Sequence, residues 1–352
     1  MSTLAWKDNW ESTRAGFADW WSQKGVLIGS WDFPVRRGEA IESIDCPGGS
    51  GELASLFDKP RLRAEWNHYN LSRHDFPESV LPIADTDIGP GSLCLFLGAT
   101  ALIEDDTVWF EPCWEEVEDV DEIGPIHFNP DSHWWKITES TLRECVRLGD
   151  GKYLTGCPDL VENVDTLASL REPQNLLLDM LESPQWVEQK LQEATTAWIG
   201  AYGRIYDIIK LDDGSSAYGA FRLWGPGKVA KVQCDASAMF SEDMFRKFVV
   251  PELQRQCEWL DHSLYHLDGT QAVRHLDALL ALEALDAIEW TPQAGIETGG
   301  NARWFPMYRR ILEAGKSLQV VNVLEHEVKP LLNAIGTEGI YILREDLKDS
   351  SP

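Results

Sequence analysis

The sequence predicts an α/β protein built as a single (β/α)8 TIM barrel with an elaborated N-terminal half. From about residue 150 onward, short apolar runs alternate with amphipathic stretches, which is the pattern of repeated βα units. The last four apolar runs begin about 20 to 35 residues apart, the length of one such unit. An open doubly wound sheet is the alternative, but no GxGxxG motif follows an early strand.

The predicted strands follow one another along the chain. The first lies within residues 25–33, after a helical stretch, and the next lies within 79–99 together with a Gly/Pro loop. Later strands are expected at 152–159, 217–225, 229–235, 263–268, 286–291, 318–323 and 339–344. Residues 105–135, rich in acids and aromatics, are interpreted as a lid or insertion, and we expect residues 1–352 to form one domain.

The segments between the late strands are predicted helices. Residues 241–261 open with a Ser N-cap and acids in the first turn, and apolar residues then recur at helical spacing. Residues 270–285 and 304–315 have the same character, and the latter segment ends at Gly315 as a C-cap.

The composition limits the classes of partner. With 58 acidic against 31 basic residues and a net charge of -27, we expect binding neither to nucleic acid nor to anionic membranes. No apolar run approaches the roughly 18 residues of a membrane span, and no secretion signal opens the chain, so a cytoplasmic location is expected. The seven cysteines are scattered without a CxxC pair, which argues against a disulfide framework. No phosphate-binding loop is present, so no nucleotide cofactor is indicated.

In a barrel of this class, chemistry belongs at the C-terminal ends of the strands. His266 and Asp268 share one face at the end of strand 263–268, because alternate side chains of a strand point the same way. Asp235 and Glu289 end the neighbouring strands. Such a group is a metal site, an acid/base couple of two carboxyl groups, or a hydrogen-bonded strand end without chemistry.

Sixteen tryptophans are the unusual feature of the composition. Core filling explains most of them, whereas those at strand ends or in the predicted lid are candidates for stacking on a substrate. The predicted substrate-binding residues are Trp31, Trp224, Trp290, Trp134, Trp135 and Asn322.

Three stretches, 156–191, 232–255 and 265–290, resemble segments of the uroporphyrinogen decarboxylase-like superfamily. That superfamily includes corrinoid-linked methyltransferases and the barrel of cobalamin-independent methionine synthase. The resemblance places His266 on the histidine of a His-x-Cys zinc motif and Asp268 on its cysteine. It places Glu289 on a metal-binding glutamate and Glu345 near the position of a last-strand cysteine.

The resemblance thus implies a zinc or other divalent metal held by one nitrogen and three carboxylates, a set that suits harder ions than zinc thiolate sites do. It implies metal-assisted methyl transfer, of the methyltransferase or demethylase type, on a small organic substrate. A corrinoid protein or a second copy of the chain is the implied partner.

Other functions stay open at this point. A carbohydrate-active hydrolase or lyase would use Asp235, Asp268 and Glu289 as acid and base, with tryptophans stacked on the sugar. A decarboxylase of an acid smaller and less anionic than uroporphyrinogen is another alternative, and a non-enzymatic binding protein is a further one.

Overall fold

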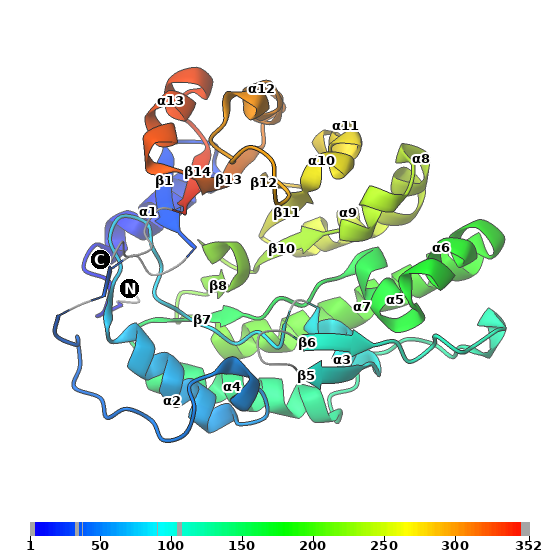
Figure 1. Cartoon of the computed structure of the whole chain (residues 1–352), viewed down its shortest axis with the longest axis horizontal. Coiled ribbons are helices and arrows are strands. Elements are labelled where there is room, and N and C mark those ends of the chain that lie inside the picture. Colours follow the sequence, from blue (N-terminus) through cyan, green and yellow to red (C-terminus); the bar gives the residue numbers. More distant parts are fainter. Residues whose placement is uncertain (1–3, 32–34, 37, 90, 104–107, 346–352) are drawn as a thin grey trace.

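The computed structural model describes residues 4–31, 35–36, 38–89, 91–103 and 108–345. Its largest feature is a parallel sheet of six strands (Figure 1). In spatial order these are β1 (Val26–Ser30), β14 (Ile340–Arg344), β13 (Ser317–Val323), β12 (Ala287–Thr291), β11 (His262–Asp268) and β10 (Val229–Gln233). The strands predicted at 229–235, 263–268, 286–291, 318–323 and 339–344 are therefore confirmed, and they lie side by side in chain order.

A second sheet of four strands faces this one from the other side of the molecule (Figure 1). Its order is β4 (Ile83–Ala84), β7 (Leu154–Cys157), β8 (Ser216–Tyr218) and β9 (Leu223–Gly225). Two short antiparallel pairs complete the described strands, namely β2 (Val35–Arg36) with β3 (His74–Asp75) and β5 (Thr100–Ile103) with β6 (Val108–Glu111).

Hydrogen bonds between the described strands leave the two sheets separate, so the closed eight-stranded barrel is not what the structure shows. On one side, β4 is only two residues long, and Pro82 before it has no N–H to donate to a neighbouring strand. On the other side, residues 217–225 are not the single strand that the sequence predicts. They form an antiparallel hairpin, in which a 3-10 turn at Ala220–Arg222 joins β8 to β9. The fold is mixed α/β with a large parallel sheet.

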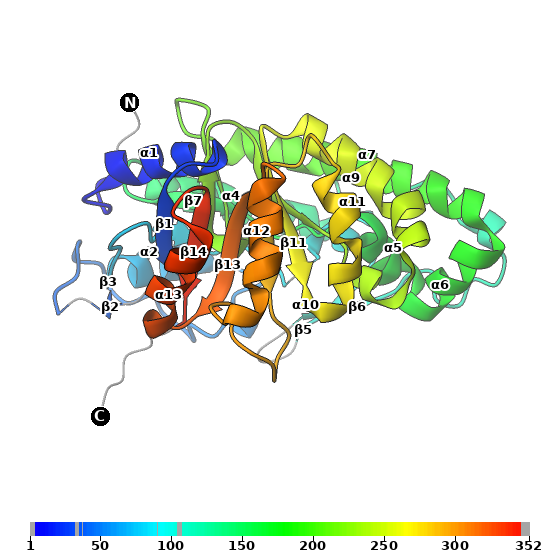
Figure 2. The same cartoon turned by 90° about the horizontal axis from the view of Figure 1, so that it is seen from above.

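Helices cover the outer sides of the sheets (Figure 2). The predicted helix at 241–261 is present, with Ser241 as its N-cap, as α8 (Glu242–Met244), a π turn at Phe245–Val249 and α9 (Val250–Trp259). The next two predicted segments hold α10 (Gly269–Ala272), α11 (Leu276–Leu280) and α12 (Phe305–Glu313), and Gly315 follows α12 with the positive φ of 75° expected there. The other helices are α1 (Trp10–Trp21), α2 (Pro60–Leu71), α3 (Ser92–Leu97), α4 (His133–Gly149), α5 (Asn163–Arg171), α6 (Pro173–Glu182), α7 (Pro184–Ile209) and α13 (Glu325–Ile335). None of the described helices has both the length and the apolar character needed to cross a bilayer.

The strand register stacks polar side chains in one row on the inner face of the six-stranded sheet. Adjacent pairs run from Gln233 to His266, Glu289, Gln319 and Tyr341 across five strands. Because side chains alternate along a strand, the intervening apolar residues point outward to the helices. This row is what brings the candidate site together.

Candidate functional site

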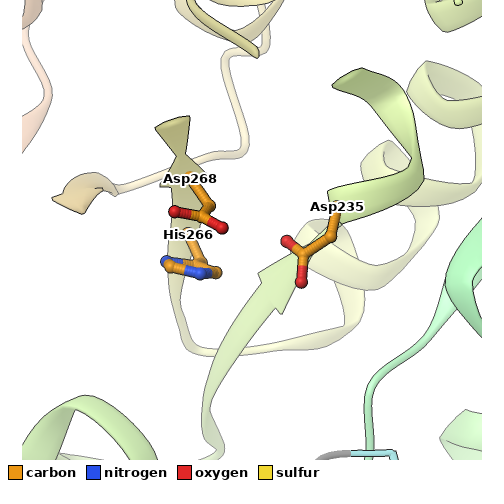
Figure 3. Close-up of side chains that lie close together, drawn as sticks. All are labelled: Asp235, His266 and Asp268. Atoms are coloured by element: carbon orange, nitrogen blue, oxygen red, sulfur yellow. The ribbon is translucent and has the colours of Figure 1, made fainter. Parts of the chain in front are cut away.

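Three potential ligand side chains meet at the C-terminal ends of β10 and β11 (Figure 3). Asp235 begins the 3-10 turn that follows β10, while His266 and Asp268 share one face of β11. One ligand atom of each lies within 4.8 Å of the others. Within the part of the chain that the structure describes, no other group of three or more His, Cys, Asp or Glu residues is this close.

Glu289 on β12 holds the imidazole of His266. Its Oε2 lies 2.5 Å from His266 Nδ1, and its Oε1 accepts a 2.7 Å hydrogen bond from the Thr291 hydroxyl. Burial would lower the pKa of His266, but the Glu289 carboxylate outweighs burial and raises it. Burial raises the pKa of Glu289, against the opposing charge of His266. Since Nδ1 is engaged, Nε2 is the His266 nitrogen available to a metal or substrate.

Asp235 is solvent-exposed, yet it is fixed in place by neighbours from β10 and α5. Its Oδ2 accepts a 2.8 Å hydrogen bond from the Gln233 amide. Its backbone N–H donates to Asp165 Oδ2 at 2.7 Å, and the next N–H, of Ala236, donates to Asp165 Oδ1 at 2.8 Å. Surrounding protein and the charge of Asp165 raise the pKa of Asp235 to about 6.

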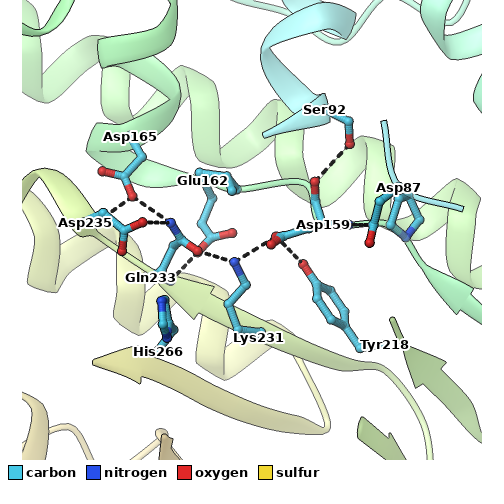
Figure 4. A network of polar contacts seen from close by, with 12 residues as sticks. Asp87, Ser92, Asp159, Glu162, Asp165, Tyr218, Lys231, Gln233, Asp235 and His266 are labelled. Carbon is cyan, nitrogen blue, oxygen red and sulfur yellow. Dashed lines mark hydrogen bonds and ion pairs between the residues drawn. The ribbon is translucent and has the colours of Figure 1, made fainter. Parts of the chain in front are cut away.

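A buried polar network continues from Gln233 into the interior between the sheets (Figure 4). Lys231, fully buried, donates to the Gln233 amide oxygen and forms a 2.8 Å ion pair with Asp159. Asp159 also accepts a hydrogen bond from Tyr218. No role for this network was expected from the sequence. The signal that could have found it is the polar alternation of Lys231, Gln233 and Asp235 in an otherwise apolar segment.

Of the four predicted metal ligands, His266, Asp268, Glu289 and Glu345, two lie in this group. Glu289 is hydrogen-bonded to His266 rather than placed as a third independent ligand, because the two residues are directly opposed on adjacent strands. Glu345 is exposed after β14, where its N–H donates to Val323, and it is outside the group of three. Asp235, predicted as a catalytic carboxylate, lies in that group instead.

Three of the predicted substrate-binding tryptophans lie in the core. Trp290 follows Glu289 on β12, so it faces outward and packs against Trp304 with ring centroids 4.8 Å apart. Trp224, on β9, packs against Trp10. Trp135 lies in the first turn of α4, not in a loop over the site, and its ring contacts those of Phe96 and Phe128. Their burial among other rings leaves them no surface for a substrate.

The remaining predicted positions differ from one another. Trp31 is half-buried after β1, and its ring lies 5.2 Å from that of Phe221, which in turn lies 4.7 Å from the His266 ring. Trp134 is half-buried in α4 beside His133. Asn322 has a φ of 54° within an irregularity of β13, a left-handed conformation that asparagine adopts more readily than most residues.

Phe221 is a site residue that the sequence analysis missed. It has a φ of 58° in the turn between β8 and β9, and this non-glycine residue in a left-handed conformation has no sequence signature. Its ring covers His266 from the side of the four-stranded sheet. The site is thus acidic on one side of His266 and aromatic on the other.

The group of one imidazole nitrogen and two carboxylates fits a divalent metal ion. A metal-binding histidine usually donates its second nitrogen's proton to a carboxylate, and Glu289 occupies that place. Nitrogen and oxygen donors without thiolate suit zinc with mixed ligands or harder ions such as Mn²⁺ and Mg²⁺. Without a metal, Asp235 and Asp268 would be two neighbouring carboxyl groups able to act as acid and base.

Comparison with known proteins relates the whole chain to a solved structure through its fold. No protein-family model matches the sequence. No curated protein matches it either. A solved structure described as a methyltransferase from Methanosarcina mazei superposes with a TM-score of 0.62 over 94% of this chain and 92% of that one, at 12% sequence identity. The chain therefore shares the overall fold of that structure.

Proposed function

We propose that this chain is an enzyme for metal-assisted methyl transfer on a small organic substrate, as a divergent member of the uroporphyrinogen decarboxylase-like superfamily with a distorted (β/α)8 barrel. The observation that carries the proposal is the convergence of Asp235, His266 and Asp268 within 4.8 Å, at the strand ends of a methyltransferase-related fold. The proposed metal ligands are these three residues, with Glu289 as the group that orients His266.

A divalent ion bound there would act as a Lewis acid that lowers the pKa of a coordinated thiol or water. The residues themselves have separate tasks. Glu289 fixes the His266 ring and compensates its charge, and Gln233 and Asp165 fix Asp235. Phe221 shields one face of His266 from water, which strengthens electrostatic interactions at the site. Trp31, beyond Phe221, is the predicted tryptophan that we retain as a substrate contact.

Metal binding is the first test. Elemental analysis of the purified protein, followed by calorimetric titration of chelated protein with Zn²⁺ and Mn²⁺, should show one ion per chain. His266→Ala and Asp268→Asn should each weaken binding by about tenfold or more, because each removes a donor atom. His127→Ala is the matched control. His127 lines a different pocket, beside α7, so this variant should bind the metal normally.

Methyl transfer is the second test. With methylcobalamin as donor and a panel of small thiols as acceptors, the metal-loaded protein should transfer the methyl group to a thiol and release demethylated cobalamin. His266→Ala should abolish this transfer. A protein that binds no metal at stoichiometric concentration, or that binds it equally without His266 and Asp268, would contradict the proposal.

One observation favours a second candidate, an acid/base hydrolase or lyase. Asp235 has its pKa raised to about 6 beside Asp268, and a raised pKa suits a carboxyl group that gives up a proton near neutrality. This candidate predicts turnover of glycosides that survives chelation. Loss of that turnover with EDTA would reject it in favour of the metal enzyme.

A further inference from the structure

Lys231 is a cation enclosed in the interior of the protein. Its side chain is 1% exposed, and the Asp159 carboxylate lies 2.8 Å from its ammonium group. Burial alone would lower the pKa of Lys231, but the Asp159 carboxylate, with its charge and its hydrogen bond, is the main group that opposes burial, and the pKa is raised, so the ammonium stays charged. A buried charge of this kind lowers stability unless an opposite charge and hydrogen bonds compensate for the lost contact with water.

Glu162 is fully buried close to this lysine, but it does not neutralise the charge of the ammonium group. Its Oε1 accepts a 2.5 Å hydrogen bond from the Gln233 backbone N–H, while its Oε2 has no hydrogen-bond partner among the described residues. Burial raises the pKa of Glu162 to about 8, against the charge of Lys231, so the carboxyl group is protonated at neutral pH. The interior therefore contains a Lys231–Asp159 ion pair beside a neutral Glu162.

Gln233 connects this pair to the candidate metal site, and its amide is fully used. The oxygen accepts from Lys231. The nitrogen donates to Asp235 Oδ2 at 2.8 Å and to Asp165 Oδ2 at 3.1 Å (Figure 4). Lys231 polarises the amide, which strengthens its two donated bonds. One oxygen of Asp235 is thereby held by Gln233, and its other oxygen would be the one to coordinate a metal ion together with His266 and Asp268.

We propose that Lys231 and Gln233 are positioning residues of the metal site, with the buried ammonium acting on Asp235 through the Gln233 amide. This inference rests on the proposed function, because Asp235 is one of the proposed ligands. It assigns to the interior lysine a role in ligand geometry at the strand ends, beyond that of balancing Asp159.

The test measures affinity for Zn²⁺ and Mn²⁺ in the full-length, chelated protein carrying K231M, Q233L or both. Loss of a residue that orients a metal ligand typically weakens binding by about 10- to 100-fold, so each single variant should fall in that range. The double variant should bind no more weakly than the weaker single variant, because Lys231 has no route to Asp235 once Gln233 is removed.

Lys190 provides the matched control. It is a buried lysine that is likewise paired with a carboxylate, Glu193 at 2.9 Å, and it donates to the Gly124 carbonyl away from the strand ends. K190M should keep the wild-type metal affinity even where its stability falls. Thermal unfolding of every variant separates lost affinity from lost folding. If K231M does not fold, Q233L decides alone, because it leaves the Lys231–Asp159 pair intact.

The outcomes separate the two proposals. Wild-type protein that binds neither ion overturns the proposed function and this inference with it. Wild-type binding that Q233L leaves unchanged overturns this inference alone. An effect of K231M that is the same size with or without Gln233 also overturns it, because Lys231 would then act independently of the amide.

Discussion

The two residue classes that stand out in the sequence, acids and tryptophans, occupy opposite sides of the sheet at β12. On β12, Glu289 faces the interior between the sheets, and Trp290 faces the helices. Both side chains are fully buried. Burial alone therefore does not distinguish a core residue from a site residue, and the contacts each one makes must decide.

Many of the buried tryptophans are held by packing against other rings. Trp20 and Trp21 lie with ring centroids 4.3 Å apart, and Trp10 meets Trp224 edge to face at 5.3 Å. Such contacts are favourable and need no ligand. Glu162 and Glu289, in contrast, are buried acids whose pKa burial raises, an arrangement that lowers stability and is typical of functional sites.

The largest effect on stability is expected on the aromatic side of this comparison. Trp290→Ala should lower the free energy of unfolding by about 3–5 kcal/mol, because it removes a fully buried indole from its contact with Trp304. Urea unfolding followed by circular dichroism measures this loss. Metal affinity should stay within about twofold at a temperature where the variant is folded, since Trp290 points away from His266. A loss below about 1 kcal/mol would show that the outer face of β12 is loosely packed.

The acidic side should make stability fall as pH rises. Burial and nearby acids raise the pKa of Glu162 to about 8 and that of Asp87 to about 7, whereas both groups titrate near 4 in an unfolded chain. Between these values the folded state binds more protons, so the stability present at low pH is lost through about pH 8 and then levels off. One such group changes stability by up to about 1.4 kcal/mol per pH unit.

Glu162→Gln cannot titrate and should flatten that fall, as measured by urea unfolding at about pH 5.5, 7 and 8.5. Glu193→Gln is the control with the opposite sign. Burial would raise the pKa of Glu193, but the hydrogen bond from the Ile126 N–H and further contacts lower it. The stability that the Glu193 carboxylate contributes is therefore lost only at acidic pH. If stability instead rises between about pH 6 and 8, this would contradict the raised pKa values of Glu162 and Asp87.

Much of the fold could be predicted from the sequence, because periodicity and caps are local. The strands at 263–268, 286–291, 318–323 and 339–344 match β11 to β14 closely. The hairpin at 217–225 could not be predicted, since its turn places Phe221 and Arg222 in left-handed conformations without a glycine. Tertiary bonds hold that turn: the Gln319 amide donates to the Phe221 carbonyl, and the Tyr341 hydroxyl donates to the Arg222 carbonyl.

The candidate site could be predicted only in part, for a similar reason. Spacing along one strand pairs His266 with Asp268, and the strand order brings Asp235 and Glu289 beside them. The sequence does not reveal that Glu289 bonds to His266, because this depends on the register between β11 and β12. The outward direction of Trp290, in contrast, follows from the inward direction of Glu289, because neighbouring side chains of a strand alternate.

The smallest effect on stability is expected at Trp31, the one predicted pocket tryptophan that the described structure links to His266 through an intervening ring. Trp31→Ala should cost no more than about 1.5 kcal/mol, because the ring is half-buried and the backbone carbonyl, not the ring, accepts the two Arg222 hydrogen bonds at 3.0 and 2.8 Å. Unfolding measured beside Trp290→Ala gives the contrast directly. A loss as large as that of Trp290→Ala would place Trp31 with the core tryptophans. A small loss accompanied by weaker methyl transfer would instead place it with the acids, as a contact for the substrate.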